Sequence, residues 1–263
     1  TGITPQNIET QNNLILLGYI SAVESYFREI IRKLILIDTE SRIASEKQQL
    51  NYGAAINYPS HLLPEALLER GSYASKENIK EAIKTFLGIR GHTNELDVTL
   101  DEFEKICHLR HCVVHRFGKL GSNNAIKFGL DSHTECLEKP ISLDQPKLYS
   151  IYQICENTVL VLNQFLYAKI MMRTVNNTVS SIWMWDLRKD KKKFQLYYNL
   201  FLKLSETIYR ESLKNLSNTS SKYIFCFPKS SLKSDFLETY IQVELQRGKT
   251  FRQYEFKNYF CIK

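Results

Sequence analysis

An arginine and a histidine separated by four residues form the strongest chemical pattern in the chain. Arg110 and His115 lie in segment 106–118, which the spacing of its apolar residues predicts to be the end of a helix. Arginine carries a planar, permanently charged group that can hold two phosphate oxygens. Histidine can take up and release a proton near neutral pH. The pair therefore suits metal-free phosphoryl transfer, in which one side chain holds a phosphodiester and the other moves protons.

This helix is predicted to begin at Thr99 and to end at Gly118. The Thr99 hydroxyl can cap the first turn, Glu102 completes a capping box, and Gly118 can adopt the left-handed conformation that ends a helix. Arg110 falls within the apolar stripe of the helix, where an unpaired charge is costly. His115 falls in the last turn.

Residues 110–115, Arg-His-Cys-Val-Val-His, resemble the Arg-polar-x-x-x-His signature of HEPN domains. These are all-helical modules, many of which are ribonucleases of toxin–antitoxin and antiviral defence systems. The resemblance implies that Arg110 and His115 are catalytic, and that His111 takes the place of the polar residue, where asparagine or aspartate is commoner.

The resemblance also implies a reaction and a set of partners. RNA would be cut by attack of its own 2′-hydroxyl, giving 2′,3′-cyclic phosphate ends, with no cofactor and no metal. Pairing of two protomers in a homodimer would bring two Arg/His sets to one cleft, and an antitoxin or regulatory protein would control the activity. His111 is the alternative source of a second proton-transfer group within one chain.

An acidic residue in the first long helix is a candidate partner for the arginine. From about Asn13 to Asp38 the apolar residues repeat at steps of four and three, and Glu24 interrupts the edge of their stripe. A carboxylate and a guanidinium in two such stripes can pair across a helix contact, so we expect Glu24 to pair with Arg110. HEPN domains resemble this arrangement. The alternative is that Glu24 is a solvated residue at the helix edge.

The remaining segments predict a mainly α fold. Ser75 caps a helix to about Leu87, a long helix follows from Leu148, and the glycines and asparagines of residues 119–146 indicate a loop or small hairpin. We therefore expect a helical bundle of HEPN type. It would comprise residues 1–178, with an insertion at residues 39–74.

Residues 179–263 have a different composition and are predicted to form a C-terminal α or α+β appendage of unassigned role. The basic run 188–193 precedes the aromatic-rich segment 194–201, a combination that can hold a nucleic-acid backbone and stack bases. The alternative is the solvated start of a helix whose aromatic side chains pack inward. Residues 223–227 and 253–257 alternate in the manner of short strands.

The charge of the chain favours a polyanionic partner. Thirty-five Lys and Arg residues against 28 Asp and Glu residues give a formal net charge of +7, which favours RNA, with a membrane surface as the lesser alternative. No run reaches the roughly 18 apolar residues of a membrane-spanning helix. Residues 1–5 lack the features of a signal peptide. We therefore expect a cytoplasmic protein with no membrane partner.

Other interpretations of the same residues stay open. Glu104, His108, His111 and His115 follow one helical stripe and could bind zinc. The six cysteines form no Cys-x-x-Cys pair and are interpreted as reduced core residues.

Arg110 could also be structural, buried against Glu24, or the domain could be a catalytically inert HEPN-like RNA-binding or dimerisation module. The sequence has no phosphate-binding glycine loop and no nucleophile elbow, which argues against nucleotide hydrolysis and serine-type hydrolysis.

Overall fold

The computed structural model describes residues 5–176, 182–184, 189–190, 192–197 and 200–201. The chain forms two compact units, residues 1–162 and 163–263. The predicted boundary between residues 178 and 179 falls within residues 177–181, which lie outside the described residues, so it stays a prediction.

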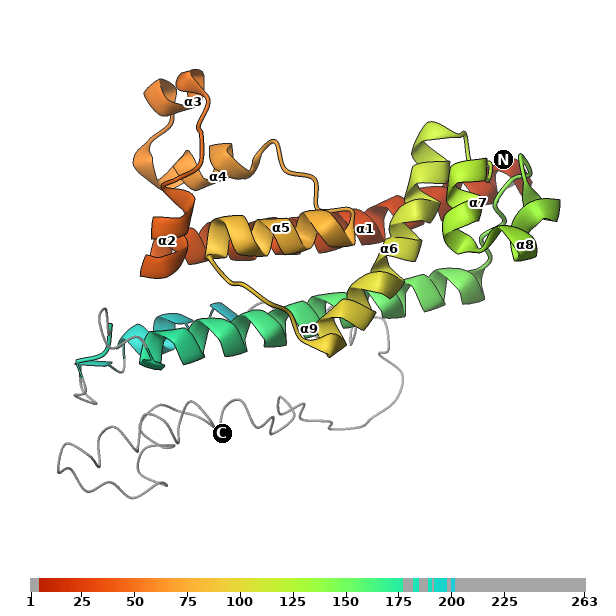
Figure 1. Cartoon of the computed structure of the whole chain (residues 1–263). Helices are drawn as coiled ribbons and strands as arrows, with labels where there is room; N and C mark the ends of the chain where they lie inside the picture. The colour runs from red at the N-terminus through yellow and green to blue at the C-terminus, as the bar shows by residue number, and fades with distance from the viewer. Residues whose placement is uncertain (1–4, 177–181, 185–188, 191, 198–199, 202–263) are drawn as a thin grey trace, which may run out of the picture. The chain divides into compact units, whose positions relative to one another are not determined.

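The first unit is built from helices (Figure 1). They are α1 (Pro5–Ile37), α2 (Thr39–Ser45), α3 (Tyr52–Asn57), α4 (Leu63–Leu68), α5 (Lys76–Leu87), α6 (Asn94–His115), α7 (Ser122–Phe128), α8 (Leu130–His133) and the first part of α9 (Gln145–Asn176), with 3-10 turns η1 (Ser60–Leu62) and η2 (Thr134–Cys136). Among the described residues no strand forms, and an isolated antiparallel bridge joins Lys119 and Pro140. The mainly α class is therefore confirmed.

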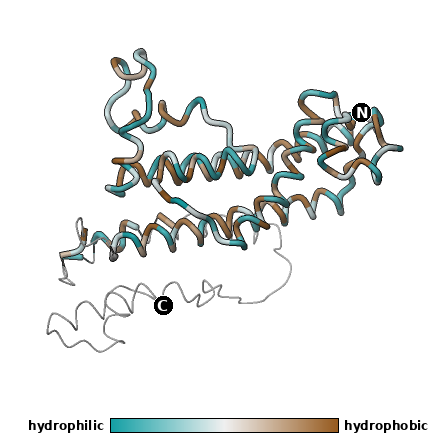
Figure 2. The backbone as a smooth tube through the Cα atoms, in the orientation of Figure 1, coloured by the Kyte–Doolittle hydropathy of each residue, from teal (hydrophilic) through white to brown (hydrophobic). Residues whose placement is uncertain are grey.

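Helix α1 is the longest element of this unit and carries its apolar stripe as the sequence predicts. The core side chains of this stripe are Leu16, Ile20, Val23, Phe27, Ile30 and Leu34, each at most 2% exposed. Figure 2 colours the backbone by hydropathy, and hydrophobic (brown) and hydrophilic (teal) stretches alternate along its helices. Helix α1 packs against α2, α4, α5 and α6, and it runs alongside α5 in Figure 1.

Helix α1 begins at Pro5, about eight residues earlier than predicted. Residues 5–12 are mostly polar and carry no apolar period, so the pattern could not reveal this turn of helix. Buried Asn12 fixes it, because its side-chain amide donates a 2.6 Å hydrogen bond to the carbonyl of Leu143. Proline also suits the first turn of a helix.

Helix α5 begins and ends as predicted. The Ser75 hydroxyl accepts a 3.2 Å hydrogen bond from the Asn78 N–H and caps the first turn. Gly88 takes the left-handed conformation, with φ +66°, and its N–H bonds to the carbonyls of Ile83 and Lys84.

The predicted start of α6 at Thr99 is wrong. Thr93 is the N-cap, and its hydroxyl accepts a 3.2 Å hydrogen bond from the Leu96 N–H. Glu95 and Asp97 lie in the first turn, where the helix dipole favours acidic side chains. Thr99 is buried inside the helix, so its spacing to an acidic residue three positions later was not a capping box.

The loop or hairpin predicted for residues 119–146 is also wrong, because this segment contains α7, α8 and η2. These short helices close over a small apolar cluster on the last turns of α6. Its members are Cys112, Leu120 and Ala125, with Phe128, Leu137 and Ile141 packed against them. Packing onto α6 therefore overrides the weak helix preference of the glycines and asparagines.

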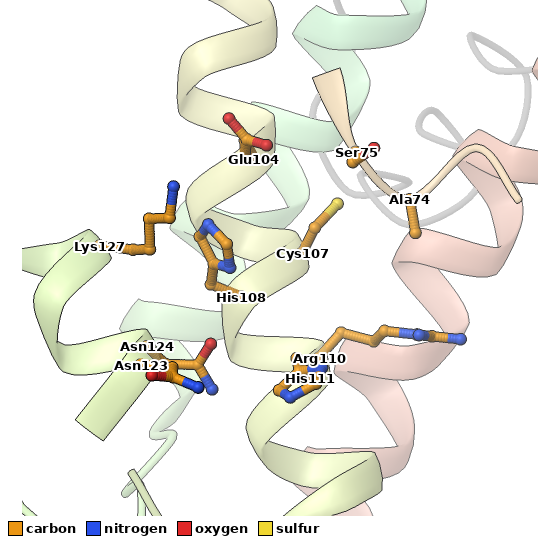
Figure 3. A pocket seen from close by; sticks show the side chains of 10 residues that line it. All are labelled: Ala74, Ser75, Glu104, Cys107, His108, Arg110, His111, Asn123, Asn124 and Lys127. Atoms are coloured by element: carbon orange, nitrogen blue, oxygen red, sulfur yellow. The ribbon is translucent and has the colours of Figure 1, made fainter. Parts of the chain in front are cut away.

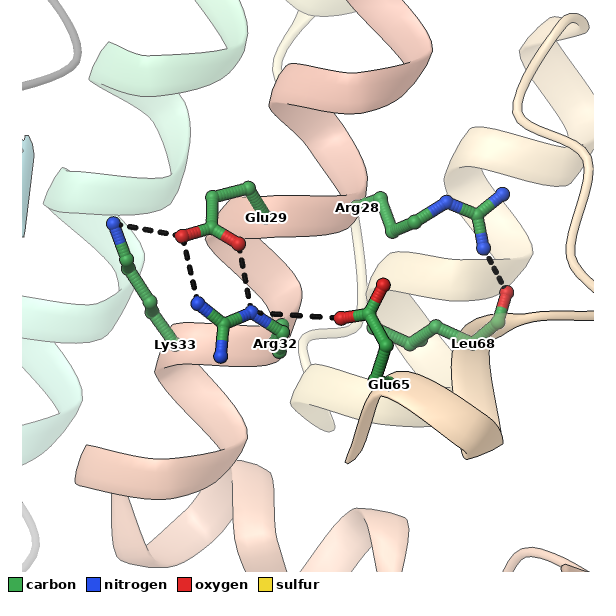
Figure 4. A network of polar contacts seen from close by, with 6 residues as sticks. All are labelled: Arg28, Glu29, Arg32, Lys33, Glu65 and Leu68. Atoms are coloured by element: carbon green, nitrogen blue, oxygen red, sulfur yellow. Dashed lines mark hydrogen bonds and ion pairs between the residues drawn. The ribbon is translucent and has the colours of Figure 1, made fainter. Parts of the chain in front are cut away.

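Charged residues of α1 hold the insertion in place (Figure 4). The Glu29 carboxylate forms ion pairs with Arg32, at an N–O distance of 2.7 Å, and with Lys33, at 2.8 Å. Arg32 also forms an ion pair with Glu65 of α4 at 3.6 Å. The neighbouring Arg28 donates to the backbone carbonyl of Leu68, and at 2.8 Å to that of residue 71. The hydrogen bond from Arg32 lowers the pKa of Glu29 to about 2, against the opposing effect of burial.

The described part of the second unit contains the end of α9 and helical residues 189–190, 192–197 and 200–201. Phe194, Tyr197 and Phe201 are buried, and the Asn163 amide donates a 3.3 Å hydrogen bond to the carbonyl of Phe201. The inward-packed alternative is therefore confirmed for these three aromatic side chains. The strands predicted at 223–227 and 253–257 lie outside the described residues.

Two further predictions from the sequence, on the cysteines and on membrane-spanning helices, can be compared with the structure. The interpretation of the cysteines as reduced core residues is confirmed for Cys107, Cys112 and Cys155, which are buried free thiols, and is wrong for Cys136, which is exposed. A search of the described helices for one with the length and apolar content needed to cross a bilayer finds none.

Candidate active site at the end of helix α6

The last turns of α6 present the predicted chemical residues next to one another. His111 and His115 are exposed, whereas Arg110 is half-buried. Helix α6 ends at His115, and Arg116 forms its C-cap with an N–H bonded to the carbonyl of Cys112. The chain thus places these three side chains on the last two turns of a helix whose other face is in the core.

The two histidines form a close pair. Their ring centroids are 4.7 Å apart and the ring planes are inclined by 46°. Residues four apart on a helix lie above one another on the same face, so the spacing of His111 and His115 produces this contact directly. Two imidazoles at this separation can serve as a base and an acid in one reaction.

In the part of the chain that the structure describes, Arg110 has no carboxylate within 4.0 Å and forms no ion pair. Figure 3 shows its side chain extending away from Lys127 and His108. A guanidinium in this state can accept an anion without first breaking an ion pair.

The predicted pairing of Glu24 with Arg110 does not form. Instead, a Glu24 carboxylate oxygen accepts a 2.9 Å hydrogen bond from the backbone N–H of Tyr73. Glu24 is half-buried on α1 and holds the segment between α4 and α5 rather than the α6 arginine. Backbone donors in that segment are invisible to a pattern of side-chain types, which is why the sequence pointed to the wrong partner.

Glu24 and Arg110 nevertheless share a neighbour, the buried thiol of Cys107. Burial raises the pKa of Cys107, Cys155 and Glu24 raise it further, and Arg110 acts in the opposite direction. The Glu24 carboxylate and the Arg110 guanidinium therefore shift the pKa of the same core thiol in opposite directions, without contacting each other.

A groove of about 350 Å³ adjoins the histidine pair (Figure 3). Its lining residues come from α6, from α7 and from the residues before α5: Ala74, Ser75, Glu104, Cys107, His108, Arg110, His111, Asn123, Asn124 and Lys127. Because His111 both lines the groove and contacts His115, the groove leads directly to the histidine pair.

His108 is the central polar residue of the groove. Burial lowers its pKa, and the positive charge of Lys127 and the neighbouring His111 lower it further. Its ring meets Phe128 edge-on, with the ring centroids 6.0 Å apart. His108 therefore favours the neutral form, which can both donate and accept a hydrogen bond.

The α7 side of the groove supplies residues that sequence reasoning missed. Asn123 and Lys127 line the groove, and Asn124 anchors this side through a 2.9 Å hydrogen bond from its amide to the Cys112 sulfur. Their part in the groove has no signal in the sequence, because the glycines and asparagines of residues 119–146 predict a loop or small hairpin. Only the fold of that segment onto α6 brings these side chains to the groove.

Two carboxyl groups meet at the other end of the groove. Glu104 and Glu77 share a hydrogen bond between their side chains. Burial and this neighbour raise the pKa of Glu104, and the pKa of Glu77 is lowered, chiefly by a hydrogen bond from its own backbone. Such a pair retains a proton more readily than an isolated carboxylate does.

The stripe Glu104, His108, His111 and His115 does not form a metal site in this structure. Among the described residues, no three or more His, Cys, Asp or Glu side chains gather in a way that could hold an ion. Glu104 is hydrogen-bonded to Glu77, His108 packs against Phe128, and the two remaining histidines contact each other.

Comparisons of this chain with protein-family models, with characterised proteins and with solved structures give no significant match.

Proposed function

We propose that this protein is a metal-independent endoribonuclease of HEPN type. The observation that carries the proposal is the His111–His115 pair at 4.7 Å, exposed on the last turn of α6 beside an arginine that has no ion-pair partner among the described residues. The spacing of Arg110 and His115, which resembles the HEPN signature, and the net charge of +7 support the same class of substrate.

In the proposed reaction, one histidine removes the proton from a ribose 2′-hydroxyl. The freed oxygen attacks the adjacent phosphorus, and the bond from phosphorus to the 5′-oxygen breaks. The other histidine donates a proton to that leaving oxygen, so the products are a 2′,3′-cyclic phosphate and a 5′-hydroxyl. Arg110 stabilises the charge that builds on the phosphate oxygens in the transition state.

The groove beside the pair provides a path for the RNA chain. Lys127 supplies a positive charge, and neutral His108 and Asn123 supply hydrogen-bonding groups for a sugar or a base. These groups lie on the surface that continues from His111, so a strand lying in the groove would present its next phosphate to the histidines.

Assembly and cellular role are part of the proposal. A homodimer would bring two copies of the site together, and light scattering at micromolar concentration checks this. A cytoplasmic toxin or antiviral effector fits a ribonuclease of this kind, with an antitoxin or regulatory protein as its partner. The alternative function is an inert HEPN-like module that binds RNA or dimerises without cutting.

The deciding experiment incubates the purified chain with single-stranded RNA in EDTA and identifies the product ends. Cleavage that gives 2′,3′-cyclic phosphates and is lost in His115→Ala, with folding retained, supports the proposal. Cleavage abolished by EDTA and restored by zinc would overturn the metal-free mechanism. Intact RNA bound by the wild-type chain would favour the inert module.

A further inference from the structure

Phe117 is the most exposed large apolar side chain in the described part of the chain. It follows His115 by two residues, and 96% of its surface is accessible. Scattered surface apolar residues are common, but a phenylalanine with almost no protein contact contributes nothing to the core. Its side chain is therefore free to meet a flat or apolar group from outside.

The backbone of Phe117 is as unusual as its exposure. Its φ is +53°, a left-handed conformation that residues with a Cβ seldom adopt, and Gly118 follows with φ +79°. A helix end commonly uses glycine at the first such position. Here glycine stands one residue later, so the chain places the strained conformation on an aromatic residue.

Hydrogen bonds on both sides fix this turn. The N–H groups of Arg116 and Gly118 both donate to the carbonyl of Cys112, at 3.0 and 3.1 Å, and the N–H of Lys119 donates to the carbonyl of Arg116 at 3.0 Å. The backbone of Phe117 is therefore fixed by the hydrogen bonds of the residues on either side of it. The conformation of this turn then directs its side chain outward.

The surroundings of Phe117 are basic. Arg116 pairs with Glu138, while Lys119 and Lys139 are exposed, and in the region that the structure describes neither lysine has an ion-pair partner. A 3.1 Å hydrogen bond from the Leu120 N–H to the Lys139 carbonyl brings the two lysine segments together. An exposed aromatic ring beside uncompensated lysines suits a single strand with a charged backbone and flat bases.

We propose that Phe117 is a stacking platform for an unpaired base of single-stranded RNA. This inference rests on the proposed function, because it places the base next to the phosphate handled by Arg110 and His115. Stacking on Phe117 fixes the strand at the end of α6, and Lys119 and Lys139 hold the backbone on the same side. In this proposal the left-handed turn presents the ring to the RNA.

The test measures binding of a 2′-O-methyl RNA of about 12 nucleotides, within the length range of single-strand sites, by fluorescence anisotropy. This probe lacks the attacking 2′-hydroxyl, so binding is measured apart from cleavage. Phe117→Ala and Phe117→Gly are expected to weaken binding by about 5- to 150-fold, and Phe117→Trp to stay within about threefold of the wild type. The control Tyr52→Ala removes another exposed aromatic, on α3, and leaves affinity unchanged.

A thermal melt separates this role from a structural one. Glycine adopts the left-handed conformation freely, so Phe117→Gly should melt no lower than the wild type while binding RNA less tightly. Unchanged affinity in Phe117→Ala, an equal loss in Phe117→Trp or in Tyr52→Ala, or no binding by the wild type would overturn the inference. Dissociation of a dimer by Phe117→Ala without loss of RNA affinity would also overturn it, in favour of a protein interface.

The two proposals fail separately. If the wild type binds the 2′-O-methyl probe through Phe117 but leaves ordinary RNA intact, the stacking site stands and the ribonuclease proposal falls. If ordinary RNA is cut and Phe117→Ala binds the probe as the wild type does, the ribonuclease proposal stands and the stacking site falls.

Discussion

The imidazole rings of His111 and His115 lie 4.7 Å apart at the end of α6, one helical turn from each other. In the proposed ribonuclease reaction, a single protomer therefore supplies two groups that can exchange protons with RNA. The HEPN signature that residues 110–115 resemble more often has asparagine or aspartate at the position of His111. The imidazole of His111 therefore adds a proton-transfer group that this position does not usually carry. The second proton-transfer group can then come either from a second protomer in a composite site or from the His111–His115 pair of one protomer.

The first prediction concerns this pair. His115→Ala and His111→Ala should each lower RNA cleavage by on the order of 10²- to 10⁴-fold, because each removes one proton transfer. The double variant should be little worse than either single variant, since groups that act as a unit are not additive. Rates are measured by single-turnover cleavage of end-labelled RNA.

The matched control is His61→Ala, which removes an exposed histidine on η1, away from the α6 histidines in the sequence and on another element. It should cut RNA at the wild-type rate. A His111→Asn variant with full activity would show that His111 supplies a hydrogen bond rather than a proton.

The second prediction concerns Arg110. Arg110→Lys keeps the charge but loses the planar group that can hold two oxygens, so turnover should fall by on the order of 10- to 1,000-fold with little change in RNA affinity. Arg90→Lys, at an exposed arginine after α5, is the control. A loss of RNA affinity in Arg110→Lys with turnover of bound RNA unchanged would assign the residue to ground-state binding alone.

The helices that carry the site could be predicted where local signals were complete. The apolar stripe of α1 and the Ser75 cap of α5 depend on nearby residues, so the sequence identified both. The start of α6 was missed because two threonines could each act as a cap, and only packing buried Thr99. The contact between His111 and His115 follows from their spacing once that helix is known.

The groove could not be predicted for a different reason. Lys127 and Asn123 reach it because α7 folds against Cys112 and Leu120 of the small apolar cluster, and that contact is tertiary. The bonding of Glu24 to the backbone of Tyr73 is tertiary as well. Periodicity specifies which face of a helix is buried, but not which neighbour it meets.

The third prediction is a pH dependence from Glu29. Because Arg32 lowers its pKa from the ordinary 4.5 to about 2, the stability that this carboxylate contributes is present above pH 4.5 and is lost as the pH falls toward 2. Glu29→Gln should therefore be less stable than the wild type near pH 6, with the difference shrinking near pH 3. Urea unfolding at both pH values measures this.

Glu46→Gln is the control for Glu29, since the Glu46 carboxylate is exposed and meets Arg42 at 3.7 Å on the surface. Its effect on unfolding should be small at both pH values. A Glu29→Gln difference that stays constant from neutral to acid pH would contradict the proposed ion-pair contribution.

The fourth prediction concerns the thiols. Burial raises the pKa of Cys155 to about 12 and also raises that of Cys107, so neither forms the reactive thiolate in the folded chain near neutral pH. Iodoacetamide should modify exposed Cys136 before Cys107 and Cys155, which should stay protected until the chain is unfolded. Peptide mass spectrometry reads the order, and early labelling of Cys155 would contradict the buried core.

The last prediction uses the bond that replaced the expected ion pair. Glu24→Ala removes the acceptor of the Tyr73 N–H and should destabilise the fold by about 1.5–3 kcal/mol, the range for a hydrogen bond to a charged group. Glu24→Gln keeps an acceptor oxygen and should lose less. Because no ion pair joins the two residues, Glu24→Ala and Arg110→Ala should be nearly additive, with a coupling energy within about 0.5 kcal/mol of zero. A double-mutant cycle by urea unfolding measures that coupling. A coupling well above this would mean that Arg110 is held by Glu24 in solution, and the guanidinium would then be engaged in the core rather than available to a phosphate.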